Sequence, residues 1–119
     1  MIILSNSANS QDVVKFKTQA LTIENIEPVK SVKQYDVKVL VVFDTKNDKI
    51  QVYLNDQDFD IIENKPTQED GESKAKSYIL VDKSGIRCKG SLFKDKKTGL
   101  YSLNITYPNV EYRYIMSIQ

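Results

Sequence analysis

The chain has 119 residues, of which 40% are hydrophobic and 28% charged, with four glycines and three prolines. This length suits one domain that buries about two thirds of its surface, and the composition excludes disordered and collagen-like classes. No apolar run approaches the roughly 18 residues of a membrane-spanning helix. The single cysteine, Cys88, and the lack of histidine exclude an intrachain disulfide and remove the commonest general base and metal ligand. We therefore expect no cofactor, no metal and no catalytic residue.

Residues 1–11 combine a short apolar start with a polar stretch of small residues that ends at Gln11. Ala8 and Ser10 have the small side chains that a signal peptidase reads before its cleavage site. We expect this segment to be the residual end of an export signal, so the protein is secreted or periplasmic. The alternative is a disordered start to a cytoplasmic protein, and whether Met1 is the true start stays open. Residues 12–119 are then a single domain.

From residue 13 onward, apolar and polar side chains alternate with a period of two, which is typical of half-buried β-strands. Val14 and Phe16 open the first strand. Residues 22–32 contain Pro28, which favours a loop or an edge crossing. Residues 35–43 alternate without a break and are predicted to form one continuous, central strand.

The rest of the chain repeats this pattern between short turns, two of which are closed by Gly85 and Gly99. A polar loop over residues 64–73 is the longest connection. Further strands are predicted over residues 50–54, 57–61, 78–81, 86–92, 101–107 and 110–118. About eight strands in consecutive hairpins predict an all-β fold, a single antiparallel meander that forms a closed or partly closed barrel. A β-sandwich is the alternative.

Charge is balanced over the whole chain, with a net charge of +1, but not locally. Residues 44–72 hold nine acidic and three basic side chains, whereas residues 73–97 hold eight basic and two acidic ones. One interpretation is an acidic edge and a basic edge that steer a charged partner. The other is ordinary pairing of opposite charges across neighbouring strands. Nearly all the cations are lysines, which argues against nucleic acid as a partner, because base recognition favours arginine.

Two local patterns have residue types found in metal or reactive sites. Asp56, Asp58 and Asp60 resemble the start of a calcium-binding loop, but Ile61 and Thr67 stand where that loop needs glycine and glutamate. Strand alternation also spreads the three carboxylates in a line. Cys88 falls on an inward face, where a thiol acts as a small apolar side chain. Neither pattern predicts a site.

The tyrosines are the most suggestive feature of the sequence. Four of the seven lie on the inward faces of the last two predicted strands, and a fifth joins them from the strand over residues 35–43. Together they could line a cavity that offers ring faces and hydroxyl groups to a ligand. The alternative is a core whose hydroxyl groups reach solvent at the rim. The candidate ligand-binding residues are Tyr35, Tyr101, Tyr107, Tyr112 and Tyr114.

Several stretches together carry a resemblance to a known group of proteins. They are residues 39–44, 49–53, 78–82 and 85–88 and the tyrosine-rich carboxyl end. The chain resembles small exported β-rich proteins of unknown function from Gram-negative bacteria. The resemblance implies export and a single β-domain, and it implies no activity, cofactor or site residue. A likeness to lipocalin-type barrels is an analogy of fold only.

These observations predict a non-catalytic, exported binding module that holds a small apolar or amphipathic ligand in a barrel mouth. The alternative is a protein–protein interaction domain that uses an exposed strand edge or its acidic and basic edges. Its partner is accordingly a small apolar ligand or another protein, with no nucleic acid and no membrane span. We expect a monomer or a weak homodimer.

Overall fold

A computed structural model of the chain describes residues 13–54 and 57–119. These residues form ten β-strands and no helix. The strands are β1 (Val13–Asn25), β2 (Ser31–Asp36), β3 (Leu40–Asp44), β4 (Lys49–Val52), β5 (Gln57–Asn64), β6 (Gln68–Glu69), β7 (Ser73–Asp82), β8 (Arg87–Asp95), β9 (Tyr101–Thr106) and β10 (Val110–Ile118).

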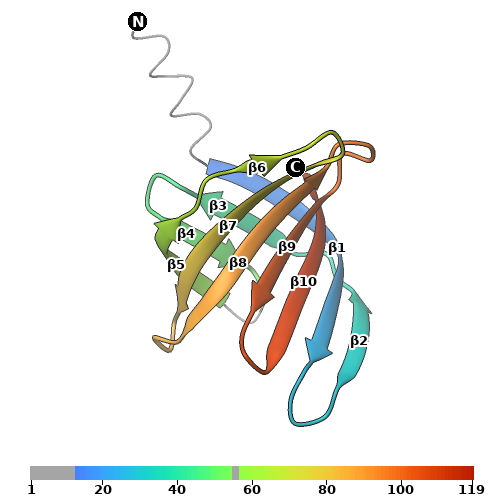
Figure 1. Ribbon diagram of the computed structural model, residues 1–119, viewed down its shortest axis with the longest axis vertical. Helices are drawn as coiled ribbons and strands as arrows, with labels where there is room; N and C mark the ends of the chain where they lie inside the picture. Colours follow the sequence, from blue (N-terminus) through green and yellow to red (C-terminus); the bar gives the residue numbers. More distant parts are fainter. Residues whose placement is uncertain (1–12, 55–56) are drawn as a thin grey trace, which may run out of the picture.

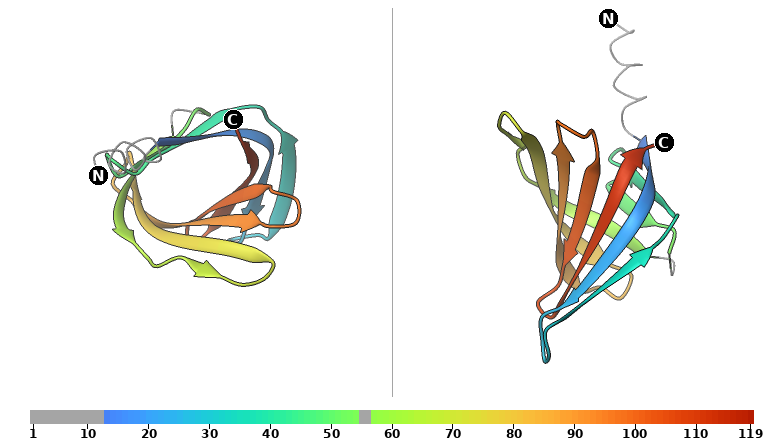
Figure 2. Two further views of the ribbon diagram at one scale, coloured as in Figure 1. Left: turned by 90° about the horizontal axis from the view of Figure 1, so that it is seen from above. Right: turned by 90° about the vertical axis from the view of Figure 1, so that its right-hand side faces the viewer.

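Eight of these strands close into an antiparallel barrel. They follow the order β1, β3, β4, β5, β7, β8, β9, β10, and β10 pairs back with β1. Figure 1 shows the wall from the side, and Figure 2 shows the closed ring from above. β2 and β6 are additional strands outside the ring, paired with β1 and β7. The predicted all-β barrel is confirmed, and the sandwich is excluded.

Alternate side chains of the wall point into the barrel, as the period-two pattern predicts. On β9 and β10, Leu103, Ile105, Tyr114 and Met116 all have 0% of their surface exposed. They form one apolar cluster with the inward side chains of the other barrel strands. An eight-stranded barrel is only just wide enough for side chains to fill it. The middle of this barrel is therefore solid core.

β1 is long enough to pair with two different strands along the same edge. Residues 13–17 pair with β3, and residues 20–25 pair with β2. The prediction of one continuous strand over residues 35–43 is therefore wrong, because β2 ends at Asp36 and β3 begins only at Leu40.

A buried hydroxyl group holds the chain where β2 and β3 separate. Thr18, which is 1% exposed, lies between the two paired segments of β1. Its Oγ1 accepts a hydrogen bond from the Val39 amide at 2.8 Å. The same oxygen lies 3.2 Å from the Val37 carbonyl and 3.1 Å from the Val39 carbonyl, to one of which its proton is donated. One side chain thus satisfies the backbone where the ladder is interrupted.

We expect Thr18→Val to lower the free energy of unfolding by about 1–3 kcal/mol, because it leaves buried backbone groups without a partner. Thr22→Val changes the half-buried outer face of the same strand and should stay within about 0.5 kcal/mol of wild type. Urea titration of both variants measures the difference. Equal midpoints would show that the Thr18 hydroxyl does not stabilise the junction.

The stretch over residues 22–32 is also more regular than expected. It contains the end of β1 and the start of β2, and Pro28 lies in the turn between them after a cis peptide bond with Glu27. The prediction of a loop is confirmed around Pro28, at residues 26–30, where no ladder hydrogen bond is needed, whereas the residues on either side belong to strands. The β1–β2 hairpin projects beyond the barrel wall (Figure 2, right).

The acidic and basic segments are neighbours in the wall. Two of the five ion pairs seen among the described residues join them, Lys83 to Asp58 at 3.7 Å and Lys96 to Glu69. All four side chains are partly exposed, so each pair contributes little to stability. For these residues, the second interpretation of the charge pattern holds, in which opposite charges of neighbouring segments pair with each other.

Residues 1–12 lie outside the described part of the chain, and so does the predicted export-signal remnant over residues 1–11. Across residues 13–54 and 57–119, no helix has the length and apolar character needed to cross a membrane.

Candidate functional site

The solid core divides the barrel interior into an upper and a lower mouth, named as in Figure 1. The upper mouth lies where β7 and β9 begin and β8 ends, and the lower mouth lies at the β7–β8 and β9–β10 turns. Each mouth holds a cavity. The candidate binding sites are these two cavities.

The upper mouth encloses the larger of the two, about 530 Å³. This lies within the roughly 300–1,000 Å³ of typical small-molecule sites. Apolar and aromatic groups contribute to its wall, together with three lysines from β7 and β8. The lining residues are Val14, Thr67, Lys74, Ala75, Lys76, Leu92, Lys94 and Tyr101.

The three lysines share the inward face of their strands. Lys74 and Lys76 alternate with outward residues in step with buried Tyr78, and Lys94 lies directly opposite Lys74 in the β7–β8 ladder. Lys76 and Lys94 are half-buried, and Lys74 is exposed at the rim. None of the three takes part in an ion pair with a described residue, and no acidic side chain lines the cavity. Glu69 lies opposite Lys74 in the β6–β7 ladder and is ion-paired with Lys96, so the four lysines and this one carboxylate sum to a net charge of +3 at the upper mouth.

An aromatic layer lies beneath these lysines. The Phe16 ring packs edge-on against Tyr101 at 4.9 Å and against Phe43 at 5.5 Å between ring centres. Lys76 Nζ lies 5.8 Å from the centre of the Tyr78 ring, and Lys94 Nζ lies 5.6 Å from that of Tyr101. Cation–π contacts of this kind hold an ammonium group over an aromatic face. The mouth thus joins cationic groups to an apolar floor.

The lower mouth has a different chemistry. Its cavity of about 380 Å³ is lined by Tyr107 and Tyr112 and by side chains of both negative and positive charge, among them Asp58, Asp82 and Lys83. The two tyrosine rings meet edge-on at 6.3 Å between centres. Because the acidic and basic groups are mixed here, this mouth has no preference for an anion.

A hydrogen-bond network fixes the lower rim. Asp82 Oδ1 accepts the Ser84 and Ile86 amide protons at 2.9 Å each, and Oδ2 accepts the Tyr107 hydroxyl proton at 2.7 Å. The bonds from Ile86 and then Tyr107 hold the pKa of Asp82 below its usual range. Burial, followed by the bond to Asp82, raises the pKa of Tyr107. Both groups keep their ordinary charge at neutral pH.

We expect Tyr107→Phe to raise the pKa of Asp82, because the carboxylate loses a hydrogen-bond donor. Since the folded-state pKa of Asp82 is depressed, this bond stabilises the fold above the unfolded pKa of about 3.9 and is lost as the pH falls below it. NMR titration of the Asp82 carboxyl measures the change. Tyr112→Phe, which keeps the bond, is the control, and an unchanged Asp82 pKa in Tyr107→Phe would contradict the prediction.

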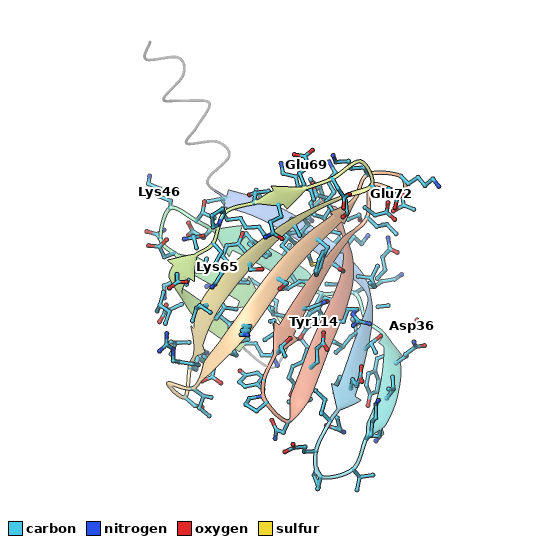
Figure 3. All side chains as sticks on the ribbon, viewed as in Figure 1. Asp36, Lys46, Lys65, Glu69, Glu72 and Tyr114 are labelled. Carbon is cyan, nitrogen blue, oxygen red and sulfur yellow. The ribbon has the colours of Figure 1, made fainter. Side chains whose placement is uncertain are left out.

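The five tyrosines proposed from the sequence do not meet in one cavity. Tyr101 lies at the upper mouth, and Tyr107 and Tyr112 lie together at the lower one. Tyr114 is buried between the mouths and donates its hydroxyl proton to Gln57 Oε1 at 3.0 Å (Figure 3). Tyr35 is 43% exposed on β2, outside the ring.

Sequence reasoning missed the lysines of the upper mouth. In the sequence, Lys74 and Lys76 belong to the basic segment, and Lys94 falls between the strands predicted over residues 86–92 and 101–107. Their signal was present, because residues 74, 76 and 78 alternate in phase on one strand. An inward tyrosine at 78 therefore implies inward lysines at 74 and 76.

Cysteine and carboxylate groups give no second site. Cys88 is 6% exposed, and burial is the main reason that its pKa is raised. Asp58 and Asp60 are paired with Lys83 and Lys49, and Asp56 lies outside the described residues. No group of three or more potential metal ligands occurs within residues 13–54 and 57–119.

Fold and cavities define a small antiparallel β-barrel protein with a cationic upper mouth and a mixed-charge lower mouth. Comparison with protein-family models, curated proteins and solved structures finds no significant match for the chain. Its function is therefore inferred from the barrel itself.

Proposed function

We propose that the protein is an exported, non-catalytic binding module that holds a small amphipathic anion in its upper mouth. The observation that carries the proposal is the set of three lysines, Lys74, Lys76 and Lys94, around a cavity with no acidic lining residue. Export is supported by the small-residue pattern of residues 1–11. A chain without histidine lacks the commonest general base, which favours binding over catalysis.

The lysines suit an anion because they repel one another without it. Like charges directly opposite in a ladder are destabilising, and Lys74 faces Lys94 in this way. An anion placed among them replaces repulsion with charge-assisted hydrogen bonds. The head group would then lie near the rim, where Lys74 is exposed.

The body of the ligand would contact the apolar part of the same cavity. Val14, Leu92 and the Tyr101 ring line it, and the buried Phe16 ring packs against Tyr101. Because this floor lies at the level of the first core layer, the cavity has room for a short or compact apolar group. A long acyl chain would have to leave most of its length in solvent.

Three probes of nearly equal shape test the charge preference. Calorimetry is carried out with naphthalenesulfonate, naphthalenemethanol and naphthylmethylammonium, which are anionic, neutral and cationic. We expect the sulfonate to bind about tenfold more tightly than the alcohol and the ammonium compound not to bind measurably. Equal affinity for all three probes, or no binding of the sulfonate, would overturn the proposal.

Charge reversal at the mouth tests the location. We expect the double variant Lys74→Glu/Lys94→Glu to lose naphthalenesulfonate binding by about tenfold or more. Lys97→Glu is the matched control, because Lys97 lies in the exposed β8–β9 turn at the same end of the barrel but does not line the cavity. Equal losses of naphthalenesulfonate affinity in both variants would mean that the probe responds only to the general electrostatic field at this end of the barrel and not to Lys74 and Lys94.

A second candidate function, weak association of two copies through β2, is favoured by the hairpin that leaves the barrel. Among the described strands β2 pairs only with β1, so its outer edge is free. Val32 and Tyr35 on this strand are 56% and 43% exposed. Lys33 and Asp36 balance in charge, so antiparallel pairing of β2 with its own copy brings no net repulsion. Free edges of this kind are templates for strand addition.

Light scattering over a range of protein concentrations tests this second function. We expect a weak dimer that forms with rising protein concentration, depends little on salt because backbone and apolar contacts hold it, and is lost in Val32→Glu. Ile62→Glu is the control, because Ile62 is 50% exposed on β5, within the ring. A monomer at every concentration and salt level would remove the candidate.

A further inference from the structure

We infer that the head group held at the upper mouth is a dianion of the phosphate-monoester type. This inference rests on the proposed function, since it names the ligand class of the same cavity. The observations that carry it are the number of lysines at the mouth, their register, and the absence of an acidic residue from the lining.

The charge at the mouth exceeds what one carboxylate or sulfonate neutralises. Lys74, Lys76 and Lys94 give three positive charges at the cavity. Glu69 on β6 is ion-paired with Lys96 and lies directly opposite Lys74 in the ladder, so the four lysines and this carboxylate sum to a net charge of +3. The hydrogen bond from Lys96 is the main reason that the pKa of Glu69 is lowered, and the charge of Lys74 also lowers it. Set against this net charge of +3, a monoanion would leave +2, whereas a dianion leaves +1.

The placement of the lysines also matches a tetrahedral group with three free oxygens. Residues directly opposite in an antiparallel pair have Cβ atoms about 4.5–5.5 Å apart, and residues two apart on a strand are about 6.8 Å apart. Lys74 and Lys94 are such an opposite pair, and Lys76 is two residues from Lys74. Lysine is a flexible point charge that commonly binds phosphate. Each ammonium group can therefore reach one phosphate oxygen.

The mouth has few groups that titrate in the range where a phosphate monoester does. The second pKa of such a monoester is about 6, so it is mainly a monoanion at about pH 5 and a dianion at about pH 7. The charged groups at or next to the mouth are the three lysines of β7 and β8, the Glu69–Lys96 pair, and Asp70, whose carbonyl oxygen accepts a hydrogen bond from Lys96. The lining hydroxyl-bearing residues are Tyr101 of β9 and Thr67. Carboxylates, lysines and tyrosines titrate mainly outside this range, and the chain has no histidine.

The test compares naphthyl phosphate with naphthalenesulfonate on the full-length protein by calorimetry. We expect the affinity for the phosphate to rise about tenfold between about pH 5 and pH 7, as the dianion forms, while that for the sulfonate stays constant. At about pH 7 the phosphate should bind more tightly than the sulfonate. Lys76→Gln should remove most of this preference, and Lys97→Gln should keep it.

The outcomes separate this inference from the function on which it rests. Equal, pH-independent binding of both probes would overturn the dianion and leave the binding module standing. Failure of both probes to bind would overturn both the dianion inference and the proposed binding function.

Inorganic phosphate and dodecyl phosphate distinguish the source of the head group. Inorganic phosphate that binds as tightly as naphthyl phosphate would support the dianion and contradict an amphipathic ligand. Tighter binding of dodecyl phosphate than of naphthyl phosphate would support a lipid-derived head group and contradict the short or compact apolar group proposed above.

Discussion

Leu103→Ala is expected to lower the free energy of unfolding by about 2–5 kcal/mol. Leu103 is 0% exposed on β9, where it lies opposite Leu92 of β8 and Tyr114 of β10. Its neighbours belong to a closed ring of strands and cannot move together to fill the space. The loss therefore combines the transfer energy of the missing methyl groups with the cavity that remains. A guanidinium titration measures it as a shift in midpoint at an unchanged slope.

The adjacent Asn104 provides the control. The sequence places it on the solvent face, but the structure shows it half-buried, with Oδ1 shielded and without a hydrogen-bond partner among the described residues. Asn104→Ala removes an unsatisfied acceptor, so it should change stability by no more than about 0.5 kcal/mol. Equal shifts for the two variants, or a larger one for Asn104→Ala, would contradict the assignment of faces in β9.

Phe16→Ala is expected to cost about 3–5 kcal/mol of stability. The ring is 2% exposed and joins two others, Phe43 and Tyr101, in edge-on contact. Such aromatic pairs add about 0.5–1.5 kcal/mol to the burial of their surface. Removing the ring also opens the floor of the upper mouth toward the core.

The control for Phe16→Ala is Val13→Ala on the same strand. Val13 is 42% exposed, so its truncation should stay within about 0.5 kcal/mol of wild type in the same denaturant titration. A loss for Phe16→Ala no larger than that for Val13→Ala would show that the aromatic layer does not close the barrel beneath the lysines.

Alternation predicted the barrel wall because the side-chain period of a strand is a local property. Leu103 and Ile105 are buried in phase with Tyr101 and Tyr107, which the alternation of the same strand places on the inward face. The break between β2 and β3 was missed because Val37 and Val39 continue the same alternation. It depends on the hydroxyl of Thr18, which lies about twenty residues away in the chain and meets Val39 only in the folded state. The residue pattern of one strand does not reveal a contact with a residue that is distant in the sequence.

The candidate site was predicted less well, since alternation gives the face of a residue but not its height in the barrel. Tyr101 and Tyr107 share the inward face, but six residues of strand place them about 20 Å apart, at opposite mouths. Tyr114 lies between the two mouths, where its side chain is part of the buried core. Lys74 and Lys76 looked like surface residues by composition. Only their pairing beside Lys94 shows that three cations share one cavity.

The central claim, that an amphipathic anion binds at the upper mouth, is tested most directly by NMR. Naphthalenesulfonate is titrated into isotope-labelled protein, and the amide shifts are followed residue by residue. The account predicts saturable shifts centred on residues 74–76, 92–94 and 101, with little change at residues 82–86 and 107–112. Shifts centred on the lower mouth, or spread evenly over the surface without saturation, would contradict it.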